Sequence, residues 1–151
     1  MHLFLLQGFT TLAVHTGVHK RKRILEVACG SGLHSLYLAK TMVSKDSLFV
    51  CTDISDKMID LAKAKFEDHD FLAVPGNRAD FRAEELLPLG EKTLDVEAFH
   101  KAGERTVVGR LANNECLPFK DASFDCYLGN LSLMLVDNYR NMLKEALRVT
   151  V

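Results

Sequence analysis

The sequence lacks an excess of charge of either sign. Its 19 Lys and Arg residues nearly balance its 20 Asp and Glu residues, so the formal net charge at pH 7 is −1. Because binding to a phosphate backbone usually shows as a basic excess, this balance argues against a nucleic-acid partner. No apolar run approaches the roughly 18 residues that span a membrane, so no membrane span is expected. A chain of 151 residues, 48% of them hydrophobic, is long enough for one domain with a core.

Paired cysteines are absent as well. The four cysteines are far apart and form no CxxC motif: Cys29, Cys51, Cys116 and Cys126. Neither a disulfide framework nor a zinc site is indicated, and we expect a reducing compartment, the cytoplasm.

His15 and His19 have the i, i+4 spacing of two ligands on one helix face. Without a third ligand in view, we favour two ordinary histidines over a metal site.

Acidic residues are missing from the first 25 residues, which are apolar and end in the basic cluster KRKR at residues 20–23. This composition loosely resembles a targeting segment, which would place the protein in mitochondria. In a secretory signal, however, the positive charges precede the apolar stretch, and a mitochondrial presequence spreads its arginines along a helix. We therefore expect the segment to pack as a helix that leads into the first strand.

Short apolar runs alternate with amphipathic segments along the chain. Four runs predict strands, at residues 23–28, 48–52, 106–111 and 124–128. Three segments predict helices, at residues 33–42, 55–66 and 137–149. Alternation of strands with helices predicts an α/β fold with a mostly parallel sheet, in a single domain of residues 1–151.

Residues 67–104 interrupt this alternation. The stretch contains two prolines and three glycines, and it predicts only short helices at residues 82–87 and 94–101. A structureless loop of this length is uncommon in a compact domain. We therefore expect local structure here, in an insertion that forms a lid or a wall of the substrate site.

The first expected strand turns through small residues into a helix, in the sequence ILEVACGSGLHS at residues 24–35. Gly30 and Gly32 lack a Cβ atom, so a ligand can approach the main chain there. Asp53 follows the second strand at the distance typical of an acid that holds ribose hydroxyls, which favours an adenosine-containing ligand. Glu26 would repel a pyrophosphate and suits a cationic ligand such as S-adenosylmethionine. A purely structural role, in which Glu26 hydrogen-bonds the N–H groups of the turn, is compatible with this.

Three ordered motifs resemble those of one protein family. ILEVACGSG at residues 24–32 is similar to the family's first motif, hLDhGCGTG, and CTDISDKMIDLAKAK at residues 51–65 to its second strand and following helix. ANNECLPFKDASFD at residues 112–125 resembles the segment that contains LPF and SFD, and LRVTV at residues 147–151 the approach to an L-K-P-G-G turn. The chain is thus similar to class I S-adenosylmethionine-dependent methyltransferases of the ubiquinone and menaquinone biosynthesis type, the methyltransferase domain 11 group.

The resemblance implies a fold and a cofactor. The family has a Rossmann-like, doubly wound sheet with strand order 3-2-1-4-5-7-6 and binds S-adenosylmethionine. In this scheme the chain is expected to contain strands 3-2-1-4 and to stop before the fifth. The fourth strand would then be an exposed edge, which a protein partner or a second copy of the chain would cover.

Roles for individual residues also follow from the resemblance. Glu26 matches an acid near the methionine ammonium, Asp53 the carboxylate that holds the ribose hydroxyls, and Ile54 the apolar residue beside adenine. The other positions matched to the cofactor site are Ala28, Gly30, Gly32, Asn113, Asn114, Asn130 and Leu131. Two of them depart from the family pattern. Ala28 replaces a glycine, which requires a negative φ, and Asn113 replaces an Asp that contacts the adenine amine, a role open to the Asn carbonyl oxygen.

Methyl transfer from a sulfonium requires positioning more than a nucleophilic side chain, and the sequence shows no catalytic triad. A general base would come from His34, His100 or Tyr127, each of which is more simply a structural residue. The N/D-P-P-Y/F signature of amino-methylating enzymes is absent at residues 129–132, which favours a small-molecule or lipid-like acceptor. Two alternatives stay open: a catalytically inactive domain of the same fold that binds or assembles, and a nicotinamide-dependent oxidoreductase, which the acid beside the glycine turn disfavours.

Overall fold

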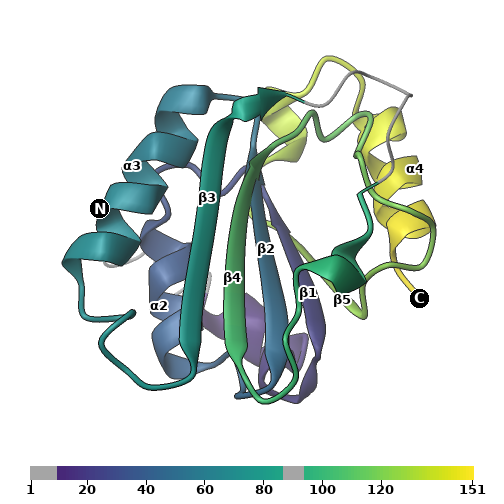
Figure 1. Ribbon diagram of the computed structural model, residues 1–151. Coiled ribbons are helices and arrows are strands. Elements are labelled where there is room, and N and C mark those ends of the chain that lie inside the picture. The colour runs from purple at the N-terminus through teal and green to yellow at the C-terminus, as the bar shows by residue number, and fades with distance from the viewer. Residues whose placement is uncertain (1–9, 87–93) are drawn as a thin grey trace.

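The computed structural model of the chain describes residues 10–86 and 94–151. Five strands in these residues form one sheet in the order β3-β4-β2-β1-β5, and all neighbouring strands pair in parallel. Figure 1 shows that the strands therefore end at the same edge of the sheet, the upper one in this view. The strands are β1 (Arg23–Val27), β2 (Ser47–Asp53), β3 (Asn77–Leu86), β4 (Arg105–Leu111) and β5 (Cys126–Gly129).

Helices cover both faces of the sheet (Figure 1). One face packs against α2 (Leu33–Thr41) and α3 (Asp56–Asp68), and the other against α4 (Tyr139–Val149). Residues 10–15 are also helical. Three short 3-10 helices complete the structure: η1 (Val18–Lys20), η2 (Val96–Ala98) and η3 (Leu133–Leu135). No helix in the described ranges is both long and apolar enough to cross a membrane.

The central strands are apolar because both of their faces are covered. In β2, Phe49 and Cys51 belong to the core under α2 and α3, whereas Leu48 and Val50 belong to the core under α4. A parallel strand buried on both faces has such a continuous apolar sequence. Strands of this kind are the easiest to predict from a sequence, and the sequence analysis predicted β1, β2 and β4.

The predicted Rossmann-like sheet is confirmed. Strands β4, β2, β1 and β5 lie side by side in the order expected for strands 3-2-1-4 of the family. The helix expected at the N-terminus lies in part outside the described residues, and residues 10–15 are helical as expected. The last helix begins at Tyr139, where the Asn138 side chain accepts hydrogen bonds from the N–H groups of Arg140 (3.1 Å) and Asn141 (3.4 Å). Such a cap satisfies N–H groups that have no partner inside the helix.

The prediction of a short helix at residues 82–87 is wrong. Residues up to Leu86 belong to β3, an additional strand that pairs with β4 at the edge of the sheet. The Phe81 ring is buried and lies over Gly109 of β4, where a Cβ atom would be 2.0 Å from a ring carbon. This fit to a neighbouring strand holds the segment extended. The helix expected at residues 94–101 is reduced to η2, and residue 87 lies outside the described residues.

Candidate functional site

The turn between β1 and α2 contains three residues with a left-handed backbone. The φ angles are +53° at Ala28, +57° at Gly30 and +74° at Gly32. The negative φ expected at Ala28 is therefore wrong. A left-handed conformation costs a residue with a Cβ atom about 1–2 kcal/mol. Strain of this kind tends to cluster at sites where a chain meets a ligand.

The two glycines of this turn have different surroundings. A Cβ atom on Gly32 would lie 2.7 Å from the Cβ of Ala62, so Gly32 permits the close packing of α2 on α3. A Cβ atom on Gly30 would meet no atom within 4 Å. The main chain at Gly30 is therefore open to a ligand.

Asp53, at the end of β2, is fixed by two backbone groups. Its Oδ2 accepts a hydrogen bond from the N–H of Gly30 (2.9 Å), and its Oδ1 accepts one from the N–H of Ser55 (3.0 Å). Each carboxylate oxygen keeps a further lone pair for a hydroxyl donor. The glycine turn and the acid predicted to act together are thus joined directly.

Glu26 lies inside the fold on β1 and is only 3% exposed. Its carboxylate accepts a hydrogen bond from the hydroxyl of Ser35 on α2. Burial raises the pKa of Glu26 to about 7, against the opposing effect of hydrogen bonds from Ser35 and Cys51. This carboxyl therefore gains or loses its proton near neutral pH, beneath the glycine turn.

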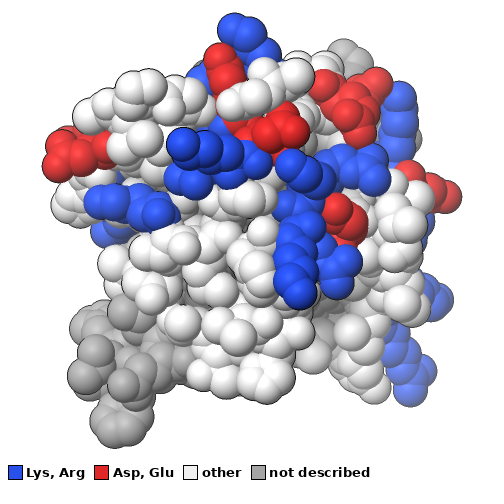
Figure 2. All heavy atoms as spheres, turned by 90° about the horizontal axis from the view of Figure 1, so that it is seen from below, with Lys and Arg blue, Asp and Glu red and all other residues white. Residues whose placement is uncertain are grey.

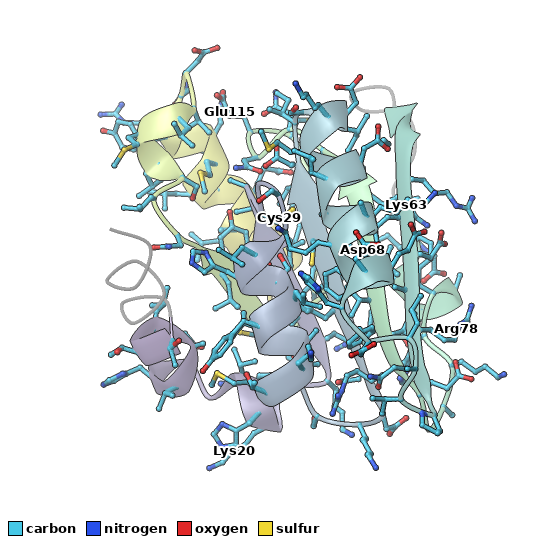
Figure 3. The ribbon with its side chains drawn as sticks, turned by 90° about the vertical axis from the view of Figure 1, so that its left-hand side faces the viewer. Lys20, Cys29, Lys63, Asp68, Arg78 and Glu115 are labelled. Carbon is cyan, nitrogen blue, oxygen red and sulfur yellow. The ribbon has the colours of Figure 1, made fainter. Side chains whose placement is uncertain are left out.

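A pocket of about 160 Å³ opens at the end of the sheet where β1 and β2 finish. Ligands of open α/β sheets bind at this end. Five of the predicted site residues line the pocket: Ala28, Asp53, Ile54, Asn113 and Asn114. Four further residues line it that were not predicted: Glu115, Leu135, Val136 and Asp137. Figure 3 shows Cys29 and Glu115 at this same end of the molecule.

The remaining predicted residues lie elsewhere. Glu26, Gly30 and Gly32 belong to the turn and the strand behind the pocket, and are not among its lining residues. Asn130 and Leu131 follow β5 and are not among the lining residues either, so their match to the cofactor site stays a prediction. The chain reaches the pocket only a few residues later, at residues 135–137.

The walls of the pocket are joined by hydrogen bonds. The side-chain Oδ1 of Asn113 accepts a hydrogen bond from the N–H of Glu115 (2.9 Å). The backbone carbonyl oxygen of Asn113 accepts one from the N–H of Cys116 (2.9 Å), which closes a tight turn after β4. The second lone pair of this Oδ1 leaves the expected acceptor role open. Glu115 in turn accepts the N–H of Asn138 (3.0 Å), which holds the start of α4 beside this wall. No sequence signal marked residues 135–137, because only this packing brings them to the site.

None of the three candidate general bases is among the residues that line the pocket. Burial lowers the pKa of His34 on α2. Burial, with a smaller contribution from the charge of Glu145, raises the pKa of Tyr127 to about 12. His100 lies 3.6 Å from Asp46, measured from Nε2 to Oδ1. The structure therefore assigns no general base.

The described part of the chain contains no group of three or more His, Cys, Asp or Glu residues placed to hold a metal ion. His15 ends the helical residues 10–15 and His19 lies in η1, with Gly17 (φ +67°) between them. The two histidines thus do not share one helix face.

Two family models match the sequence, and both are described as a methyltransferase domain. They cover residues 24–102 and 97–151. No curated protein matches the chain.

Several solved structures are similar in fold. The YcgJ protein from Bacillus subtilis has a TM-score of 0.62 and 16% identity, over 95% of this chain and 46% of its own. A SAM-dependent methyltransferase from Aquifex aeolicus has a TM-score of 0.63 and 16% identity, over 93% of this chain and 57% of its own. The [4+2]-cyclase SpnF has a TM-score of 0.67 and 16% identity, over 96% of this chain and 40% of its own.

The chain spans about half the length of these structures. At such identities the likeness shows the fold, and the cyclase among them shows that the fold by itself does not determine the reaction. The first family model, in contrast, covers more than half of the chain. The chain therefore belongs to the methyltransferase domain family, with the class I S-adenosylmethionine-dependent methyltransferase fold and S-adenosylmethionine as the cofactor.

Proposed function

We propose that this chain forms one domain that binds S-adenosylmethionine at the pocket beside β1 and β2 and transfers its methyl group to a small-molecule or lipid-like acceptor. The observation that carries this proposal is the Asp53 carboxylate, which Gly30 and Ser55 fix at the edge of the pocket. Its free lone pairs suit the two hydroxyls of a ribose.

The other lining residues suit the rest of an adenosine. Ile54 and Leu135 are 68% and 74% exposed, so they offer apolar surface to an adenine ring. Asn113 and Asn114 supply amide groups to the edge of such a ring. A volume of about 160 Å³ is below the roughly 300–1,000 Å³ of a complete ligand site. The pocket would thus hold the adenosine, and the methionine part would extend over the open backbone at Gly30.

Glu26 supports a ligand that carries positive charge. A cation above the turn would favour the ionised form of this buried carboxyl. Since the pKa of Glu26 is about 7 in the free protein, binding would release part of a proton at neutral pH. When bound, S-adenosylmethionine supplies an activated methyl group, and the residues of the chain hold it and exclude water.

The surroundings of the pocket favour an apolar acceptor. Leu133, Met134 and Leu135 of η3 are 49%, 75% and 74% exposed, and the last of them lines the pocket. An exposed apolar group beside a pocket is typical of a binding surface. A lipid-like or aromatic acceptor would contact this rim while its reacting atom reaches the methyl group.

Calorimetric titration of the chain with S-adenosylmethionine and with NAD tests the proposal. We expect one site for S-adenosylmethionine, with proton release that appears as a dependence of the heat on the buffer, and no binding of NAD. Asp53→Asn is expected to weaken binding at least tenfold, because one charge-assisted acceptor is lost. The matched control is Asp60→Asn on the exposed face of α3, which should bind as the wild type does.

The outcomes separate the alternatives. Binding of NAD alone would contradict the proposal, and binding of neither would favour an inactive domain that serves in assembly. Where S-adenosylmethionine binds, formation of S-adenosylhomocysteine in the presence of quinol, phenol or lipid acceptors distinguishes an active enzyme from an idle one.

We also propose that a protein partner or a second copy covers the surface beyond β5. This strand is the edge of the described sheet, and Tyr139, Leu143 and Leu147 of α4 are 53%, 46% and 81% exposed. Sedimentation velocity tests self-association: a dimer that Leu147→Glu dissociates supports a second copy, and a monomer at all concentrations leaves only a different partner.

The unpaired cysteines support our placement of the chain in the cytoplasm, which fluorescence imaging of the tagged protein would check.

A further inference from the structure

The first pocket, where β1 and β2 finish, is lined by acidic residues and by no lysine, arginine or histidine. The acids are Asp53, Glu115 and Asp137, each with one formal negative charge. Asp53 ends β2, Glu115 lies in the turn after β4, and Asp137 comes shortly before α4. Acidic groups therefore reach this pocket from three separate parts of the chain.

These three carboxylates form no ion pair with any described residue. Asp53 accepts the two backbone N–H groups of Gly30 and Ser55, and Glu115 accepts that of Asn138. The positive ends of α3 and α4 lie close by, and each amounts to about half an elementary charge. Together the two helix ends offset only about one of the three negative charges, so the lining of the pocket stays negative.

The acids at a second pocket, of about 510 Å³ on β3 and β4, are paired instead. Asp80 forms ion pairs with Arg110 (2.9 Å) and Arg82 (3.2 Å), and Glu104 forms one with Arg78 (3.4 Å). Figure 2 shows Lys and Arg side chains grouped across the middle of the end where the strands begin, with acidic side chains beside them. The first pocket lies at the opposite end, and its acids have no such partners.

Asn114 adds a buried polar group to the first pocket. It is 8% exposed and lines the pocket, and its side-chain amide makes no hydrogen bond within the described residues. Buried polar groups are nearly always hydrogen-bonded, so an unpaired amide beside a pocket points to a polar ligand. The amide thus indicates a ligand independently of the acids, and the acids indicate that this ligand is positively charged.

Given that the pocket binds S-adenosylmethionine as proposed above, we propose that Glu115 and Asp137 determine its charge specificity. They make the pocket favour a positively charged adenosine derivative over a neutral or an anionic one. Asp53 is tied to the ribose by its position, whereas Glu115 keeps its Oε2 and Asp137 its whole carboxylate free of hydrogen bonds to the described chain. Two unneutralised charges at a few ångströms from a ligand change its affinity several-fold each.

This specificity distinguishes the cofactor from its product. On transfer the bond between methyl carbon and sulfur breaks, its electron pair stays on sulfur, and a lone pair of the acceptor forms the new bond to carbon. The sulfonium becomes a neutral thioether, so the ligand loses one positive charge and with it part of its attraction to the acids. The same acids would repel adenine nucleotides, whose phosphates are anionic.

Calorimetric titrations with S-adenosylmethionine, S-adenosylhomocysteine and adenosine 5′-monophosphate test the inference in the wild type and in the double variant Glu115→Gln, Asp137→Asn. Both amides keep the shape of the side chain, and the new amide oxygen at position 115 can still accept the N–H of Asn138. We expect the affinity ratio of S-adenosylmethionine to S-adenosylhomocysteine to fall about tenfold in the double variant. The ratio should also fall in the wild type at about 0.5 M salt, because salt screens the charges. Adenosine 5′-monophosphate should bind the double variant several-fold more tightly than the wild type.

The ratio is informative because the two ligands share all other groups, so a general loss of fit cancels. Glu67→Gln, which removes an exposed acid near the far end of α3, is the matched control and should keep the ratio of the wild type. An unchanged ratio in the double variant, with S-adenosylmethionine still bound, would overturn the role of Glu115 and Asp137 and leave the proposed function standing. Absence of binding of every adenosine compound to the wild type would overturn both.

Discussion

Positive φ angles in the turn after β1 serve different purposes at different residues. Gly32 needs its missing Cβ for packing, because Ala62 of α3 occupies the adjacent space. Gly30 has open space beside it, and its N–H fixes Asp53. Ala28 adopts the same conformation with a Cβ atom present and lines the pocket. The same sequence motif thus combines a position required for packing, a position with open space beside its main chain, and a position that lines the pocket.

Gly32→Ala is expected to destabilise the fold by about 3 kcal/mol, because a strained φ and an overlap with Ala62 are added together. Gly17→Ala is the matched control. Its φ is +67°, but a Cβ atom there meets nothing within 4 Å, so only about 1 kcal/mol is expected. Urea unfolding measures both free energies. Equal losses in the two variants would show that the contact with α3 is not limiting.

Glu26 makes the stability of the fold depend on pH. Its folded pKa of about 7 lies above the ordinary value of 4.5, so the folded state binds the proton more tightly. The resulting stabilisation is fully present below pH 4.5 and is lost as the pH rises through 7. The loss between pH 5 and pH 8 amounts to about 2–3 kcal/mol.

In Glu26→Gln this dependence is expected to disappear, since the amide does not titrate. The free energy of unfolding of both proteins, measured at pH 5 and at pH 8, gives the difference. The wild type should lose about 2–3 kcal/mol more than the variant over this interval. Parallel pH profiles would mean that the carboxyl has an ordinary pKa in the folded protein.

At the level of elements, β3 is the part of the fold that the sequence analysis missed. Its polar residues Arg78, Asp80 and Arg82 alternate with Ala79 and Phe81, a period of two that is typical of a strand with one buried face. The charged residues concealed this pattern, because the other strands were recognised by their predominantly apolar sequences. The side chains of Arg78, Asp80 and Arg82 line a pocket that forms only when β3 pairs with β4.

Phe81→Ala is expected to cost about 3–4 kcal/mol, because the ring is 6% exposed and packs 5.0 Å from that of Phe66, centre to centre. The loss should be accompanied by faster amide hydrogen exchange along β3. Leu61→Ala on α3, where the side chain is 44% exposed, is the control and should cost far less. Protection of β3 that survives the loss of the ring would show that β4 pairing alone holds the strand.

At the scale of the whole molecule, one arginine docks α4 against the segment that follows β4. Arg148 donates to the carbonyl oxygens of Leu117 (3.0 Å) and Phe119 (2.7 Å) and to the carboxylate of Asp121 (2.8 Å). It also contacts Glu145, which accepts the N–H of Leu117 (2.7 Å). Through this docking, residues 113–115 and 135–137, separated by about 20 residues in the chain, line the same pocket.

Arg148→Met is expected to lower the free energy of unfolding by about 2 kcal/mol, since two carbonyls and two carboxylates lose a charged donor. It should also weaken S-adenosylmethionine binding several-fold, although Arg148 does not line the pocket. Lys144→Met, exposed on the same helix, controls for the loss of a charge. A variant with wild-type affinity and reduced stability would show that the pocket does not depend on this docking.

The sequence by itself determined the parts of the protein that depend on local order. The buried strands, the glycine turn and the position of Asp53 could be predicted from the sequence. Apolar runs specify the strands, and the short spacing between small residues and the acid specifies the turn and the end of the next strand. The tertiary structure alone decided the φ of Ala28, the entry of residues 135–137 into the first pocket, and the pocket on β3 and β4. Each of these depends on contacts between segments far apart in the chain, whose free energy no local pattern records.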